Sequence, residues 1–214
     1  MPAMPVCRAC KGTNVYMFLP LGDHPPANAF LTPERAAEGP QAAFPLDVSA
    51  CLDCGVVIVP DLLPPDFFQD YHYVPSASAT MHAHFGEFAR LVRERHAPSR
   101  GKLVVDIGCN DGLFLKACSD LGIDTLGIDP AENIAALARA QGIEVECAYF
   151  GPDVAADLRE RYSPATVITT TNTLNHIDDL HDFVRGVDVL LDDDGTFIVE
   201  VPQALELVEQ NEFD

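Results

Sequence analysis

The chain has 214 residues and carries 33 acidic against 13 basic side chains, which gives a formal net charge of −20. A surface this acidic repels nucleic acid and anionic membrane, so neither is expected as a partner. No apolar run reaches the ~18 residues of a membrane span, and the N-terminus lacks the basic and apolar regions of a secretory signal. The seven cysteines are an odd number, which favours the reducing cytoplasm over a disulfide framework.

Residues 1–75 are rich in proline and cysteine and are predicted to form a small β domain that binds zinc. Strands are expected at 15–19 and 56–59, with a long proline-rich loop over 20–45. Two C-x-x-C pairs supply the four thiolates of a closed structural zinc site. A redox-active pair is the alternative, although it needs only one such motif. The predicted metal ligands are Cys7, Cys10, Cys51 and Cys54.

Residues 76–100 are predicted to link the two domains. Met81, Phe85, Phe88 and Val92 share one face of a helix over 79–96. Just before it, the stretch Asp70–Tyr73 contains two tyrosines and a histidine. These side chains either line a pocket or are half-buried linker aromatics.

From residue 101 to 214 the pattern alternates strands with helices, which predicts an α/β fold with a doubly wound, mostly parallel, Rossmann-like sheet. The last helix should bury a stripe that includes Phe183, Val184 and Val187. The predicted strands are 103–107, 124–128, 143–147, 165–171 and 195–201, and the predicted helices are 112–121, 131–141, 152–161 and 178–191.

The first strand of this unit runs into Asp106 and a turn spaced by Gly108 and Gly112. Glycine allows the backbone to turn sharply and a ligand to approach closely. A second strand ends in Asp129, an acid placed to bind the two hydroxyls of a ribose. Together these features predict a cofactor that contains adenosine.

The carboxylates Asp106 and Asp111 would repel the pyrophosphate of a dinucleotide, but they suit the positively charged sulfonium and ammonium groups of S-adenosylmethionine. The turn resembles the first motif of class I S-adenosylmethionine-dependent methyltransferases. The alternative is an ordinary turn between strand and helix. The predicted cofactor-binding set includes Asn110 in this turn and Pro130, which starts the next helix.

Residues 169–179 cover the end of the fourth strand and the loop that follows it, where ligands bind in such sheets. Asn172 and His176 are therefore expected to face the cofactor mouth. His176 could take a proton or hydrogen-bond an oxyanion, or it could pack at the start of the next helix.

In their order along the chain, the cysteine pairs, Tyr71–His72–Tyr73, residues 106–112 and residues 172–177 resemble the deoxysugar C-methyltransferases, which methylate C-3 of nucleotide-linked 4-keto sugars. The resemblance implies a zinc-bearing N-terminal domain, a central S-adenosylmethionine domain, a C-terminal Rossmann-like domain, and a monomer for the full-length fold. It places Tyr71, Tyr73 and His176 in the active site and Phe150 where the adenine packs. It also implies a nucleotide-linked sugar as the substrate.

The family's Tyr-x-Glu-His motif, to which the resemblance assigns the catalytic base, would fall just beyond Asp214. The last two strands of a seven-stranded sheet are also missing from the sequence. We therefore expect an incomplete sheet in a C-terminally truncated chain, either a fragment or a degenerate copy. The alternatives are a methyltransferase with an O- or N-acceptor and a non-catalytic module that binds zinc and cofactor.

Overall fold

The computed structural model describes residues 5–96 and 101–211, which divide into two compact units. The second unit comprises Phe68–Ile177 and His181–Val201, and the first takes the remainder. Residues 68–75, assigned by sequence to the N-terminal module, thus belong to the second unit. The end of the predicted linking segment, residues 97–100, and the outer domain ends at residues 1 and 214 lie outside the described residues. No helix in the described part of the chain has the length and apolar composition needed to cross a bilayer.

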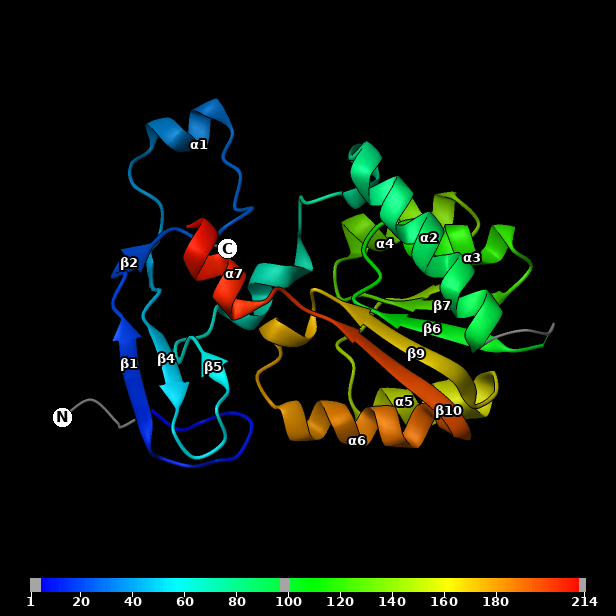
Figure 1. The fold of residues 1–214 in the computed structure, drawn as a ribbon. Helices are drawn as coiled ribbons and strands as arrows, with labels where there is room; N and C mark the ends of the chain where they lie inside the picture. Colours follow the sequence, from blue (N-terminus) through cyan, green and yellow to red (C-terminus); the bar gives the residue numbers. More distant parts are fainter. Residues whose placement is uncertain (1–4, 97–100, 212–214) are drawn as a thin grey trace. The chain divides into compact units, whose positions relative to one another are not determined.

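The first unit is built from short antiparallel strands (Figure 1). Strand β4 lies between β1 and β5, and β2 pairs with β3. The predicted strand at 15–19 is confirmed, whereas the predicted loop over 20–45 is only partly correct because it contains β2, β3 and one short helix. The elements are β1 (Val15–Leu19), β2 (Asp23–His24), α1 (Pro33–Ala37), β3 (Phe44–Pro45), β4 (Val48–Cys51), β5 (Val57–Ile58) and α7 (Ala204–Gln210).

The second unit contains one parallel sheet of five strands in the order β10-β9-β6-β7-β8. This is the doubly wound α/β sheet predicted from the alternating pattern. Its strands are β6 (Leu103–Ile107), β7 (Asp124–Ile128), β8 (Val145–Glu146), β9 (Ala165–Thr171) and β10 (Leu191–Glu200). Its helices are α2 (Ala79–Arg95), α3 (Leu113–Asp120), α4 (Glu132–Ala140), α5 (Pro152–Arg161) and α6 (Leu180–Leu190), with 3-10 turns η2 (Pro75–Ala77) and η3 (Leu174–His176). The 3-10 turn η1 (Pro65–Gln69) contains residues of both units.

Helices cover both faces of the sheet, with α2, α3 and α4 on one side and α5 and α6 on the other (Figure 1). Alternate residues of β6 supply the two cores: Val104 packs with α2 and α3, and Val105 packs with α5 and α6. Because the strands are parallel, all their carboxyl ends lie at one edge, which gathers the loops that follow them.

Several sequence predictions differ from the structure in detail. The strand predicted at 143–147 is only the two residues of β8. Helix α4 begins two residues after Pro130, because Ala131 is its N-cap. Strand β10 starts at Leu191 rather than at 195. Val184, placed by sequence in the buried stripe of α6, is 52% exposed, because Gly186 packs against Phe150 and turns the buried face away from it.

Candidate functional site

The loop between β6 and α3 is a tight turn held against the end of β7. Its backbone is left-handed at Gly108 (φ 77°), Asn110 (φ 50°) and Gly112 (φ 78°). The N–H groups of Gly108 and Cys109 both donate to the carbonyl of Ile128, at 2.8 and 3.2 Å. The turn is therefore locked to the strand that ends in the predicted ribose-binding acid.

Gly108 and Gly112 lack a side chain, and neighbouring residues occupy the space that a Cβ would take. A Cβ on Gly108 would lie 2.1 Å from Thr173 Oγ1, and a Cβ on Gly112 would lie 2.9 Å from Ala138 Cβ. The first contact brings the loop after β9 against the turn, and the second allows α3 to start close to α4. A cofactor contact by either glycine stays a prediction.

Three carboxyl groups are buried around this turn. Asp106, Asp111 and Asp129 are 2%, 1% and 8% exposed. Asp106 Oδ1 accepts a hydrogen bond from Thr169 Oγ1 at 2.7 Å, and Asp111 Oδ1 has no hydrogen-bond partner among the described residues. No ion pair found in the described part of the chain joins any of the three to a basic side chain.

Burial changes the acidity of two of these groups. Burial raises the pKa of Asp106 to about 7; the hydrogen bond from Thr169 opposes this rise, and the charges of Asp129 and Glu200 add to it. Burial also raises the pKa of Asp129, against hydrogen bonds from the N–H groups of Ala131 and Asn110. With no ion pair to a basic side chain among the described residues, burial thus favours the neutral form of both carboxyl groups.

Asp129 connects the turn to the start of α4. Its Oδ2 accepts from the N–H of Asn110 and its Oδ1 from the N–H of Ala131, both at 2.9 Å. Pro130 lies between these contacts, and its carbonyl is 3.6 Å from the thiol of Cys147. Each Asp129 oxygen retains a lone pair that a ribose hydroxyl can use.

Two further predicted cofactor residues lie on neighbouring elements. Asn172 follows β9 with left-handed backbone (φ 54°), and its N–H donates to the carbonyl of Glu200 at 2.8 Å. Phe150 is half-buried, with its ring edge-on to Phe183 at 5.4 Å and against Gly186. Part of the Phe150 ring therefore packs in the core against α6 and is not accessible to a ligand.

A strap over residues 71–76 is tied to the turn and to α4 by hydrogen bonds. Asn110 Nδ2 donates to the carbonyl of Tyr73 at 3.1 Å, and the N–H of Ser76 donates to Asp111 Oδ2 at 3.2 Å. Asn133 in α4 contacts both the N–H and the carbonyl of Tyr71. Tyr73 is 40% exposed. The hydrogen bonds thus fix the backbones of both tyrosines beside the turn.

Phe68 joins two of the predicted catalytic residues. Its ring centroid lies 6.0 Å from that of Tyr71 and 5.4 Å from that of His176. His176 ends η3, directly after β9, and its Nε2 is 3.1 Å from Asn175 Nδ2. The structure therefore brings Tyr71 and His176, far apart in sequence, against one aromatic ring.

The sequence did not single out Phe68, Thr169, Asn133 or the pair formed by His84 and Glu200. His84 lies on α2, and its Nε2 is 3.0 Å from Glu200 Oε2. Glu200 ends β10, so the pair links α2 to the carboxyl edge of the sheet. The only sequence feature that could have indicated this pair is an acidic residue at the end of a strand. That feature can be used only once the end of the strand is known.

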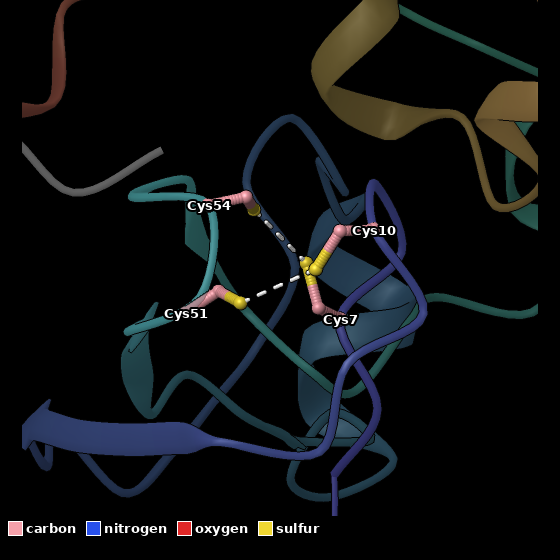
Figure 2. A group of neighbouring side chains, drawn as sticks. All are labelled: Cys7, Cys10, Cys51 and Cys54. Atoms are coloured by element: carbon pink, nitrogen blue, oxygen red, sulfur yellow. Dashed lines mark hydrogen bonds between the residues drawn. The ribbon is translucent and has the colours of Figure 1, made fainter.

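In the first unit, the four predicted metal ligands converge (Figure 2). Their sulfur atoms all lie within 4.8 Å of one another, with 3.7 Å between Cys7 and Cys54 and 3.5 Å between Cys10 and Cys51. A tetrahedral zinc ion with Zn–S bonds of about 2.3 Å separates its sulfurs by about 3.8 Å. The four sulfur atoms are therefore gathered closely enough to suit a tetrahedral zinc site.

Two similar turns build this cluster. The N–H of Lys11 donates to the carbonyl of Cys7, and the N–H of Gly55 donates to that of Cys51. Lys11 (φ 61°) and Gly55 (φ 80°) both have left-handed backbone directly after the second cysteine of each pair. Burial raises the pKa of the Cys7 thiol, but hydrogen bonds from the N–H groups of Cys10 and Ala9 outweigh it and lower the pKa to about 7.

Comparison with known families gives two matches along the chain. Residues 7–68 match a family described as "Putative zinc binding domain", and residues 81–213 match one described as "Methyltransferase domain".

Among curated proteins, the chain is 34% identical over 209 residues to C-methyltransferase NovU of Streptomyces niveus, covering 97% of this chain and 50% of that protein. It is 29% identical over 120 residues to a ubiquinone biosynthesis O-methyltransferase of Azorhizobium caulinodans, covering 54% of this chain and 45% of that protein. The chain thus spans about half the length of the curated relatives it matches. Among solved structures, the PH0226 protein of Pyrococcus horikoshii OT3 has a TM-score of 0.50 at 17% identity, with 65% of this chain and 62% of that chain covered.

Proposed function

Because the chain belongs to the methyltransferase-domain family, we propose that its second unit binds S-adenosylmethionine at the turn between β6 and α3. One observation carries this proposal: Asp106, Asp111 and Asp129 are buried around one turn, and no basic side chain of the described residues pairs with them. Buried carboxylates without counter-charge are costly, and a cationic ligand removes that cost. A sulfonium and an ammonium group on one ligand supply the missing charge.

Four of the predicted residues have distinct roles in this proposal. Asp129 accepts hydrogen bonds from the ribose hydroxyls with the lone pairs that Asn110 and Ala131 leave free. Asp106 provides negative charge for the methionine part of the cofactor. Asn172 and the accessible part of Phe150 contact it from the loops beyond the neighbouring strands.

We further propose that the complete protein transfers the methyl group to carbon, at a position next to the ketone of a nucleotide-linked deoxysugar. The name of the relative from Streptomyces niveus supports carbon as the acceptor, and its match extends over both units of this chain. The O-methyltransferase relative covers only about half of the chain, which is consistent with a shared cofactor unit rather than a shared acceptor site.

Tyr71 and His176 would carry the acceptor chemistry. A ketone acidifies the neighbouring C–H, so a base can remove that proton and leave negative charge on the ketone oxygen. His176 and Tyr71 both lie against Phe68. The neutral imidazole of His176 can take the proton, and the phenol of Tyr71 can donate a hydrogen bond to the ketone oxygen. The bound cofactor supplies the electrophilic methyl group. Phe68 keeps the two side chains together and excludes water from one side.

In the first unit, Cys7, Cys10, Cys51 and Cys54 would bind one zinc ion with a structural role. Four thiolates complete a tetrahedral set and leave no position open for a substrate. This zinc would therefore stabilise the fold of the unit and take no part in the transfer.

Calorimetry tests the cofactor proposal. We expect S-adenosylmethionine to bind the chain, and Asp129→Asn to weaken binding by ~1–3 kcal/mol through the loss of charge-assisted hydrogen bonds. Asp124→Asn is the matched control, because Asp124 is exposed at the opposite end of the same strand. Absence of binding at millimolar cofactor, or equal affinities for wild type and Asp129→Asn, would contradict the proposed site.

A further inference from the structure

The side-chain amide of Asn133 contacts the backbone of Tyr71 through both of its polar atoms. The N–H of Tyr71 donates to Asn133 Oδ1 at 3.3 Å, and Asn133 Nδ2 donates to the carbonyl of Tyr71 at 2.7 Å. One amide thus satisfies both backbone groups of one residue, as a neighbouring strand would.

Only a side-chain amide of this length can make both contacts. Aspartate lacks the donor, and an aliphatic side chain lacks both groups. Asparagine is also a weak helix former, since its side chain competes for backbone hydrogen bonds. Asn133 therefore lowers the stability of α4 at an exposed position. Its two hydrogen bonds with Tyr71 offset that loss.

Asn133 is the second residue of α4, and Asp129 fixes the segment just before this helix through the N–H of Ala131. The same carboxylate binds the N–H of Asn110, whose side chain holds the carbonyl of Tyr73. Two routes therefore run from Asp129 to the strap over residues 71–76, one through each asparagine.

We propose that Asn133 is a positioning residue that fixes Tyr71 and couples it to the cofactor site. Occupation of the site at Asp129 orders the start of α4, and Asn133 transmits that order to Tyr71. Coupling of this kind is reciprocal, so an ordered Tyr71 also favours the bound cofactor. The coupling to the cofactor rests on the proposed function. The contact between Asn133 and Tyr71 does not depend on it.

Backbone amide hydrogen exchange at Tyr71 tests both parts. In the absence of cofactor, we expect Asn133→Leu to speed exchange of the Tyr71 amide about tenfold through loss of its acceptor. Asn133→Asp keeps that acceptor, so exchange should return close to the wild-type rate. Leu137→Ala is the matched control, because Leu137 is 44% exposed on the same helix.

S-adenosylmethionine should then slow exchange at Tyr71 in wild type but not in Asn133→Leu, whereas the thermal midpoint of Asn133→Leu stays at the wild-type value. Unchanged exchange in Asn133→Leu would overturn the contact, and equal protection by cofactor in both proteins would overturn the coupling. If the wild-type chain does not bind cofactor, both the proposed function and the coupling are contradicted. The contact is then decided by the exchange rates of wild type and Asn133→Leu measured without cofactor.

Discussion

Substitution of Gly108 by alanine tests how the turn after β6 is packed. The residue has φ 77°, so a side chain there pays the left-handed penalty of ~1–2 kcal/mol. The new Cβ would also lie 2.1 Å from Thr173 Oγ1, 2.8 Å from Thr173 Cγ2 and 2.9 Å from Thr173 Cβ. Relieving that overlap must move the loop after β9, at the ~1–3 kcal/mol typical of overpacking. The expected loss of unfolding free energy is therefore about 2–5 kcal/mol.

Gly122 offers a matched control for the backbone term alone. Its φ is 75°, and a Cβ there would meet no atom within 4 Å. Gly122→Ala should therefore cost only the left-handed penalty of ~1–2 kcal/mol. Urea unfolding, with the midpoint and slope fitted for each variant, gives the difference between the two glycines.

A second variant separates the contact from the backbone. In a Thr173→Gly background the neighbouring side chain is gone, so Gly108→Ala should cost about as much as Gly122→Ala, ~1–2 kcal/mol. Equal losses for Gly108→Ala in the two backgrounds, or a loss no larger than that of Gly122→Ala, would refute the packing of Thr173 against the turn.

Two further predictions follow from buried acids and from thiols. The pKa of Asp106 is raised to about 7 by burial, and a cationic cofactor favours its ionised form, so affinity should increase as pH rises through about 7 and fall up to ~10-fold per unit below it. Calorimetry between pH 5.5 and 8.5 measures this, and an equally steep profile in Asp106→Asn would assign the titration to another group. Cys54→Ser should lower the zinc content measured by atomic absorption, because three thiolates remain. Cys147→Ser, outside the cluster, is the control, and unchanged zinc in Cys54→Ser would contradict the four-cysteine site.

Periodicity and turn chemistry were sufficient for most of the sheet. The strands at 103–107, 124–128 and 165–171 were predicted with the bounds that the structure shows, because each is rich in β-branched or apolar residues and is followed by an acid, glycine or asparagine. The first unit was harder to predict. Strands β2 and β3 are two residues each, too short to show alternation, and β4 is held by its neighbours β1 and β5.

The candidate site divides in the same way. Cys7, Cys10, Cys51 and Cys54 could be grouped from spacing alone, and the structure confirms that they converge. Spacing says nothing about contacts between distant segments, so neither Phe68 between Tyr71 and His176 nor the pair of His84 with Glu200 could be predicted.

By itself, the sequence determined the α/β class, the turn with its acids, and the cysteine set, because these depend on residues close together in the chain or on a repeated motif. Only the tertiary structure decided that three carboxyl groups are buried without a basic partner, since burial depends on what the folded chain places above them. It also decided that Thr173 fills the space beside Gly108 and that Asn133 holds Tyr71. These contacts join residues 62 or more positions apart. They come within hydrogen-bonding or van der Waals distance only because the loops after β6 and β9 and the start of α4 meet at the same edge of the folded sheet.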